Sequence, residues 1–147
     1  MTVAAVYYHF ASKAEVLQEL VERIGERVVA LFPPPPPRQR VDLAAWLGDR
    51  HDALACWRAE DPEAAALYLT ASAGFSPAVE AVRRGQRREM VVAVAEAVAR
   101  ARLRRRQIEA HVIAVGLLSL LLDTVPKTSA SRDTVVDVGL RMAGVSA

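Results

Sequence analysis

The amino-acid sequence predicts an all-α fold, and three observations support this. Apolar residues recur at spacings of three and four over most of the chain, as with Leu17, Leu20 and Ile24. Serine, aspartate, proline and glycine, which start and end helices, lie between these periodic segments. No segment alternates apolar and polar residues between turn residues, so no strand is predicted.

The first predicted helix covers residues 12–31 and begins with a capping box. The Ser12 hydroxyl can accept the amide of Glu15, whose carboxylate can reach back to the start of the helix. Five consecutive prolines at positions 33–37 end the helix, because they supply no amide donors and favour an extended conformation. We expect this segment to be a stiff spacer between an N-terminal element and the main body.

Five further helices are predicted from their start and stop residues. Asp61 and Ser76 each precede a proline, which is a favoured arrangement at a helix start, and Ser131 caps the last helix. Pro126 should stop the helix that precedes it. The predicted ranges are 41–59, 61–74, 77–101, 104–125 and 131–144.

Composition and charge narrow the class of protein. The chain has 147 residues, of which 52% are apolar and 24% charged, so a packed core is expected and global disorder is not. The net charge of +2 does not by itself indicate nucleic-acid binding. The arginines between positions 83 and 106 form a local excess of positive charge. We favour the interpretation that they lie on a solvated helix face and a basic loop over the interpretation that they bind phosphate.

The sequence predicts a cytoplasmic location. Cys56 is the single cysteine, so no internal disulfide is possible. The first 20 residues contain charged side chains and no apolar core of a signal peptide. The most apolar stretch, residues 112–122, is too short to span a bilayer, which needs about 20 residues.

The N-terminal residues carry the most specific pattern. Residues 2–17 indicate a short helix, a tight turn and a capped second helix. Thr2 can cap the short helix, whose small side chains keep it slim enough for a major groove. Tyr7, Tyr8 and His9 offer donors of the kind that contact phosphate oxygens, and Lys13 lies where helix amides also favour an anion.

This run resembles the end of the helix-turn-helix of the tetracycline-repressor (TetR) family. The matching residues are Thr2, Val6, Tyr7, Tyr8, His9, Phe10, Ser12, Lys13 and Val16. The resemblance covers about 17 of 147 residues, and the rest of the chain is similar only in helical architecture. It implies a recognition helix at positions 2–8. The implied DNA-binding residues are Thr2, Val3, Ala4 and Ala5 near base edges or backbone, and Tyr7, Tyr8, His9 and Lys13 on phosphates.

The family places two helices before the recognition helix, and this sequence has no residues for them. Met1 stands where the family usually has valine, and a GTG valine codon can be read as a bacterial start. We hypothesise that the reading frame was assigned too short or that the gene is truncated. As it stands, the chain is expected to bind operator DNA weakly or not at all, because a short unsupported helix is marginal in water.

The resemblance also implies a division of the chain and a mode of dimerisation. Residues 1–32 would be the remnant of the DNA-binding domain, 33–40 the spacer, and 41–147 a ligand-binding and dimerisation domain. The last two helices would form a four-helix bundle with those of a second subunit. The expected interface residues are Val112, Val115, Gly116, Leu118, Ser119, Leu122, Val136, Gly139, Leu140 and Ala143. The alternative is that both helices are ordinary core of a monomer.

Large or polar side chains within alanine-, leucine- and valine-rich helices are candidates for lining a small-molecule site. They are Trp46, His51, Trp57, Tyr68, Phe75 and His111. For each of them core packing is the competing interpretation. The sequence offers no metal-ligand spacing and no cofactor motif, so neither a metal nor a cofactor is expected.

Together these features predict a ligand-responsive, DNA-binding transcription regulator that acts as a homodimer. Repression is expected because it is the commonest activity of the family. The alternative is a head-deficient protein that dimerises and binds a small molecule without binding DNA. An enzyme is not expected, because His51 and Cys56 lie about 140° apart around a helix and no catalytic motif is present.

Overall fold

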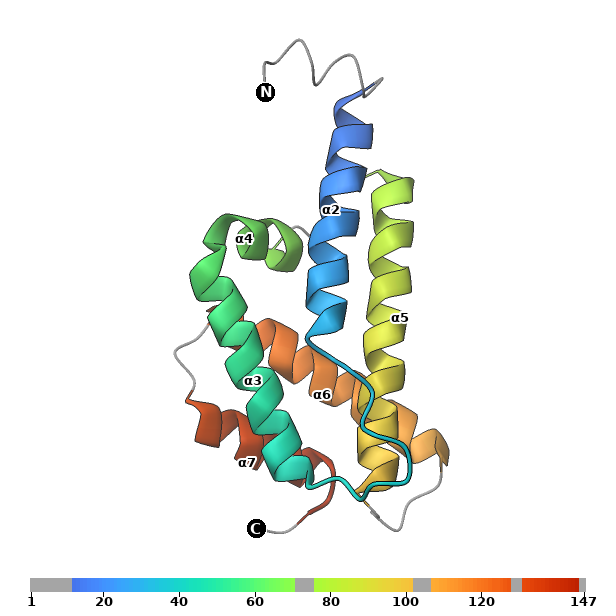
Figure 1. Cartoon of the computed structure of the whole chain (residues 1–147), viewed down its shortest axis with the longest axis vertical. Coiled ribbons are helices and arrows are strands. Elements are labelled where there is room, and N and C mark those ends of the chain that lie inside the picture. The colour runs from blue at the N-terminus through green and yellow to red at the C-terminus, as the bar shows by residue number, and fades with distance from the viewer. Residues whose placement is uncertain (1–11, 71–75, 102–106, 128–130, 146–147) are drawn as a thin grey trace.

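A computed structural model describes residues 12–70, 76–101, 107–127 and 131–145, and within them it confirms the all-α prediction (Figure 1). The described residues contain helices and no strand. The helices are α2 (Lys13–Ala30), α3 (Leu43–Glu60), α4 (Pro62–Thr70), α5 (Pro77–Arg100), α6 (Gln107–Lys127) and α7 (Arg132–Met142).

The helix starts confirm the predicted caps. The Ser12 hydroxyl accepts the amide of Glu15 at 3.3 Å, and Asp61 accepts the amide of Ala64 at 3.1 Å. Ser76 and Ser131 cap α5 and α7 in the same way. One end differs from expectation, because α6 continues through Pro126 to Lys127. A proline in the last turn removes only one hydrogen bond of the helix, so α6 ends just after it.

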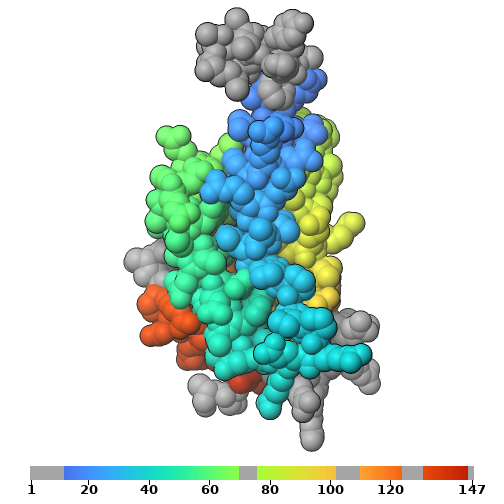
Figure 2. All heavy atoms as spheres, viewed as in Figure 1, coloured from blue at the N-terminus to red at the C-terminus, as the bar shows by residue number. Residues whose placement is uncertain are grey.

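Helix α6 packs against α3, α4, α5 and α7, and α2 packs against α4 and α5. Helices α2 and α5 lie side by side along the long axis of the molecule, and α6 crosses behind them (Figure 1). Helix α3 packs against α6 and α7. The space-filling view shows α2 flanked by α4 on one side and α5 on the other (Figure 2). Helix α2 is therefore an integral part of the helical body.

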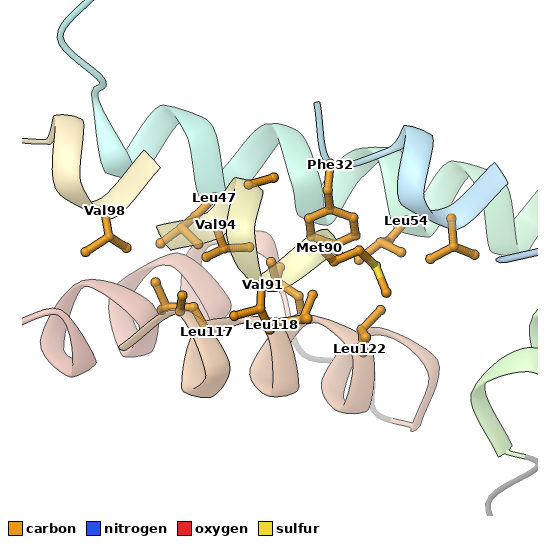
Figure 3. Packing of buried hydrophobic residues seen from close by; sticks show 14 of the residues in the cluster. Phe32, Leu47, Leu54, Met90, Val91, Val94, Val98, Leu117, Leu118 and Leu122 are labelled. Carbon is orange, nitrogen blue, oxygen red and sulfur yellow. The ribbon is translucent and has the colours of Figure 1, made fainter. Parts of the chain in front are cut away.

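The core lies where α3, α5 and α6 meet (Figure 3). Fully buried side chains from each helix fill it, including Leu47 of α3, Val94 of α5 and Leu117 of α6. Val21 and Val28 of α2 and Phe32 belong to the same cluster. At roughly 1.5–3 kcal/mol for each large apolar side chain removed from water, this burial stabilises the arrangement of all the helices at once.

The sequence suggests that the proline segment separates α2 from the body, but in the structure it does not. The guanidinium of Arg100, at the end of α5, donates hydrogen bonds to the carbonyls of Pro35 and Pro36. The amide of Val41 donates to the carbonyl of Arg100 at 3.2 Å. Proline has no backbone N–H, but its carbonyl remains a good hydrogen-bond acceptor. One arginine that donates to two such carbonyls can therefore hold the segment against α5. The segment is thus a fixed connection between α2 and α3.

The packing of α6 predicts a large cost for truncating Leu118, whose side chain is fully buried. Leu118→Ala should lower the free energy of unfolding by about 2–5 kcal/mol, because it removes buried methyl groups and leaves a cavity. Urea unfolding at fixed protein concentration measures this. Val92→Ala is the control, because Val92 is 51% exposed and should cost less than about 1 kcal/mol. Equal costs for the two variants would contradict the described core.

Candidate functional site

A cavity of about 260 Å³ lies between α4, α5 and α6. Its lining combines apolar side chains with three arginines and two carboxylates. The lining residues are Tyr68, Leu69, Glu80, Arg83, Arg84, Arg87, Met90, Leu122 and Asp123. Ligand sites in proteins are typically somewhat larger and lined mostly by apolar residues with a few placed polar groups, so this cavity is small and unusually charged.

Two of the cavity arginines are held by neighbouring helices. Arg83 donates to the carbonyl of Tyr68 at 2.7 Å, and its guanidinium carbon lies 5.6 Å from the centre of the Tyr68 ring. Arg87 donates to the hydroxyl of Ser119 on α6 at 2.6 Å. Each guanidinium has five N–H groups in a fixed plane, so these bonds orient the arginines and leave further donors in each.

The ring of Tyr68 connects the cavity to a buried polar network. Its hydroxyl donates to Gln86 Oε1 at 3.0 Å, and burial raises the pKa of Tyr68 to about 12 although Arg83 and Arg87 oppose this. The phenol is therefore neutral and a donor near pH 7. Gln86 Nε2 donates to the α2 carbonyl of Glu22 at 3.1 Å and approaches that of Val21 at 3.5 Å.

Gly25 makes room for this network at the contact between α2 and α5. A Cβ atom on Gly25 would lie 2.0–2.2 Å from the side-chain atoms of Gln86. No other residue type could occupy that position without displacing the Gln86 amide. The glycine therefore allows a buried amide to hydrogen-bond to a neighbouring helix backbone, which satisfies its polar groups inside the core.

A second cavity, of about 460 Å³, lies along the contact between α2 and α5. Its residues are Glu22, Glu26, Val29, Ala30, Ala81, Val82, Gly85, Gln86 and Glu89. The three glutamates give this groove a negative lining, opposite in sign to the arginine-lined cavity. Gln86 borders the groove and contacts Tyr68 of the first cavity, so it lies between the two.

Of the six predicted ligand residues, the structure places Tyr68 in the arginine-lined cavity. Trp57 is buried in the core, and Trp46 packs at 6.5 Å from the ring of Phe32. His51 contacts Asp52 at 3.0 Å. His111 is exposed on α6, and Phe75 lies outside the described residues.

The sequence prediction missed the arginines. Arg83, Arg84 and Arg87 recur at three- and four-residue spacing, which indicated one helix face, but a solvated face was the favoured interpretation. The exposure of Arg84, Arg87 and Arg88 fits that interpretation, and of these three Arg88 alone does not line the cavity. Nothing in the spacing shows that α4 and α6 flank the neighbouring arginines.

Of the predicted DNA contacts, Lys13 belongs to the described part of the chain. The others lie outside the described residues: Thr2, Val3, Ala4, Ala5, Tyr7, Tyr8 and His9. Lys13 is the first residue of α2 and is exposed. Lys13 therefore lies in the first turn of α2, where the helix dipole adds positive potential.

The predicted interface residues fall into three groups. Val112 and Val115 are exposed, and with the exposed Val138 and Met142 of α7 they form what we call the apolar patch. Gly116, Ser119, Val136 and Leu140 are partly buried. Leu118, Leu122, Gly139 and Ala143 are instead buried within the protomer itself.

Both glycines of these helices serve contacts within the protomer. A Cβ on Gly116 would lie 2.7 Å from Met142 Cε, and one on Gly139 would lie 2.9 Å from Leu47 Cδ1. Close packing of α7 on α3 thus accounts for Gly139 without a second subunit, whereas at Gly116 the flexible end of Met142 alone would have to move. A dimer contact through this region would therefore use the apolar patch, since the deeper residues already face the protomer's own core.

Comparisons of the chain with models of protein families, with curated proteins and with solved structures found no match. In the part of the chain that the structure describes, no cluster of three or more histidine, cysteine, aspartate or glutamate side chains is arranged to hold a metal ion. The helices described here are also too short or too polar to cross a membrane.

The network around Tyr68 predicts an alkaline effect on stability. The folded-state pKa of about 12 exceeds the ordinary value of about 10, so the stabilising contribution is complete below pH 10 and is lost as the pH rises towards 12. Its size should be about 2–3 kcal/mol. The Tyr68→Phe variant should not show this alkaline loss of stability. At pH 7 its free energy of unfolding should be about 1–3 kcal/mol lower, because Gln86 loses its hydrogen-bond donor. Urea unfolding of both proteins between pH 7 and 11.5 tests this, and parallel curves would contradict it.

Proposed function

We propose that this protein is a ligand-responsive, DNA-binding transcription regulator that acts as a homodimeric repressor. The observation that carries the proposal is the run Tyr7-Tyr8-His9-Phe10, followed by Ser12 and Lys13 at the start of α2. These groups suit phosphate contacts beside a short recognition helix. The resemblance of this run to TetR regulators supplies the expectation of effector control.

The position of α2 supports the proposed control. This helix follows directly from the predicted DNA-contacting residues and is hydrogen-bonded to Gln86 of α5. Gln86 in turn contacts Tyr68 at the arginine-lined cavity. A small molecule that prefers one arrangement of these helices would shift the population towards the matching arrangement of the DNA-binding ends.

The apolar patch supports the proposed homodimer. Val112 is 66% exposed, and Val115, Val138 and Met142 are also open to solvent on adjacent helices. Exposed apolar side chains on two helices that pack against each other commonly mark a protein interface. A second copy related by two-fold symmetry would cover the same residues on both subunits and remove them from water together.

DNA binding is tested by a gel shift with DNA that flanks the gene. Two proteins are compared: the 147-residue chain and the product extended upstream in the same reading frame. We expect specific binding by the extended product, with half-sites about 34–36 Å apart or a multiple. Lys13→Ala should weaken binding similarly on all sequences and reduce the salt slope by about 1. Arg23→Ala, on the same helix but paired with Glu19, is the control. Absence of specific binding by both products would favour the dimerising, small-molecule-binding alternative.

Dimerisation is tested by light scattering at micromolar concentration. Val115→Asp and Val138→Asp should each convert a dimer into monomer, because a buried, unpaired carboxylate would oppose association at the apolar patch. Val92→Asp, an equally polar change at an exposed valine of α5, should leave the dimer intact. A monomeric mass for the unchanged protein would refute the homodimer.

A further inference from the structure

We infer that the cavity between α4, α5 and α6 binds an organic carboxylate with a short apolar chain, and that this compound is the effector. The inference rests on the proposed function for its regulatory meaning. Its chemistry rests on the cavity, where the guanidinium groups of Arg83, Arg84 and Arg87 gather on one helix.

The charge of the lining favours a monoanion. Three guanidinium groups face two carboxylates, those of Glu80 and Asp123, so one positive charge is in excess. A carboxylate would balance this charge, whereas a phosphate monoester carries about −1.5 to −2 near neutral pH. Planar guanidinium groups also match the two oxygens of a carboxylate with paired hydrogen bonds.

Two of the three arginines are oriented before any ligand arrives. Arg83 is bonded to the Tyr68 carbonyl on α4, and Arg87 to Ser119 on α6. Side chains that are already fixed lose less conformational freedom on binding, which raises affinity. The bonds use only part of each donor set, so both guanidinium groups can still bind an anion.

The remaining lining sets the size of the ligand. Leu69, Met90 and Leu122 offer apolar contact beside the arginines. A volume of about 260 Å³ is at the small end for ligand sites, which favours a chain of about eight carbons over a larger ligand. The negative groove between α2 and α5 would repel the same anion, because Glu22, Glu26 and Glu89 line it.

Occupancy of this cavity would reach α2 through Tyr68. The phenol ring borders the cavity, and its hydroxyl holds Gln86, which holds the backbone of α2 beside Gly25. A ligand that fixes the Tyr68 ring therefore reduces the freedom of α2 relative to α5. The expected signature is slower amide hydrogen exchange in the middle of α2.

Calorimetric titration at pH 7 with octanoate, octan-1-ol and octylamine tests the site. Octanoate should bind, and the two matched compounds should bind at least tenfold more weakly, because they lack the negative charge. Arg87→Gln should weaken octanoate binding about tenfold or more. Arg87→Gln also removes the bond from Arg87 to Ser119, which could disturb the packing of α5 on α6. Arg84→Gln makes the same test at an exposed side chain and leaves that bond in place.

Arg88→Gln is the matched control, since Arg88 is exposed on the same helix and does not line the cavity. It should bind octanoate as the unchanged protein does. Equal binding of all three probes, stronger binding of octylamine, or equal losses in the Arg84, Arg87 and Arg88 variants would overturn the carboxylate site. Octanoate binding without slower exchange in α2 would overturn the route through Tyr68.

These measurements contain no DNA, so they separate the inference from the proposed function. If the chain binds octanoate with slower amide exchange in α2, but neither the chain nor the extended product binds DNA, the proposed regulator is refuted and the carboxylate site is retained. DNA binding by the extended product together with no octanoate binding would refute the site and retain the regulator.

Discussion

Gln86 lies between three helices and joins them by hydrogen bonds inside the core. Its amide nitrogen donates to the backbone of α2, and its oxygen accepts the hydroxyl of Tyr68 on α4. Leaving either end unpaired would cost about 1–3 kcal/mol, so the three helices keep one relative position. Gly25 permits this contact because any side chain there would overlap the amide. The placement of α2 thus depends on polar pairing as well as on apolar burial.

The same residue separates two cavities of opposite charge. Arginines face the cavity on the α4 and α6 side of α5, and glutamates line the groove on the α2 side. Glu22 and Glu26 of the groove belong to α2 and Glu89 to α5, so the negative potential arises between the two helices, whereas the three arginines all belong to α5. Since Gln86 borders the groove and contacts Tyr68, a shift at either cavity bears on the same hydrogen bonds.

Local features of the fold were predictable, and distant pairings were not. The caps at Ser12, Asp61, Ser76 and Ser131 follow from interactions that span three residues, which a sequence displays directly. The course of the proline segment depends instead on Arg100, more than sixty residues away. Proline content predicts extension, but it carries no information about which surface will hold the extended chain.

The same limit explains the candidate site and interface. Aromatic size suggested a ligand role for Trp57, but a large apolar ring is equally suited to the core, where the structure places it. Helix α6 is apolar on nearly every side, so its sequence could not separate the buried Leu118 from the exposed Val112. Once the protomer's own core takes Leu118, some apolar side chains of α6 and of the adjacent α7 remain exposed. Their exposure is unfavourable in water, and in the proposed homodimer the same residues of a second copy would cover them.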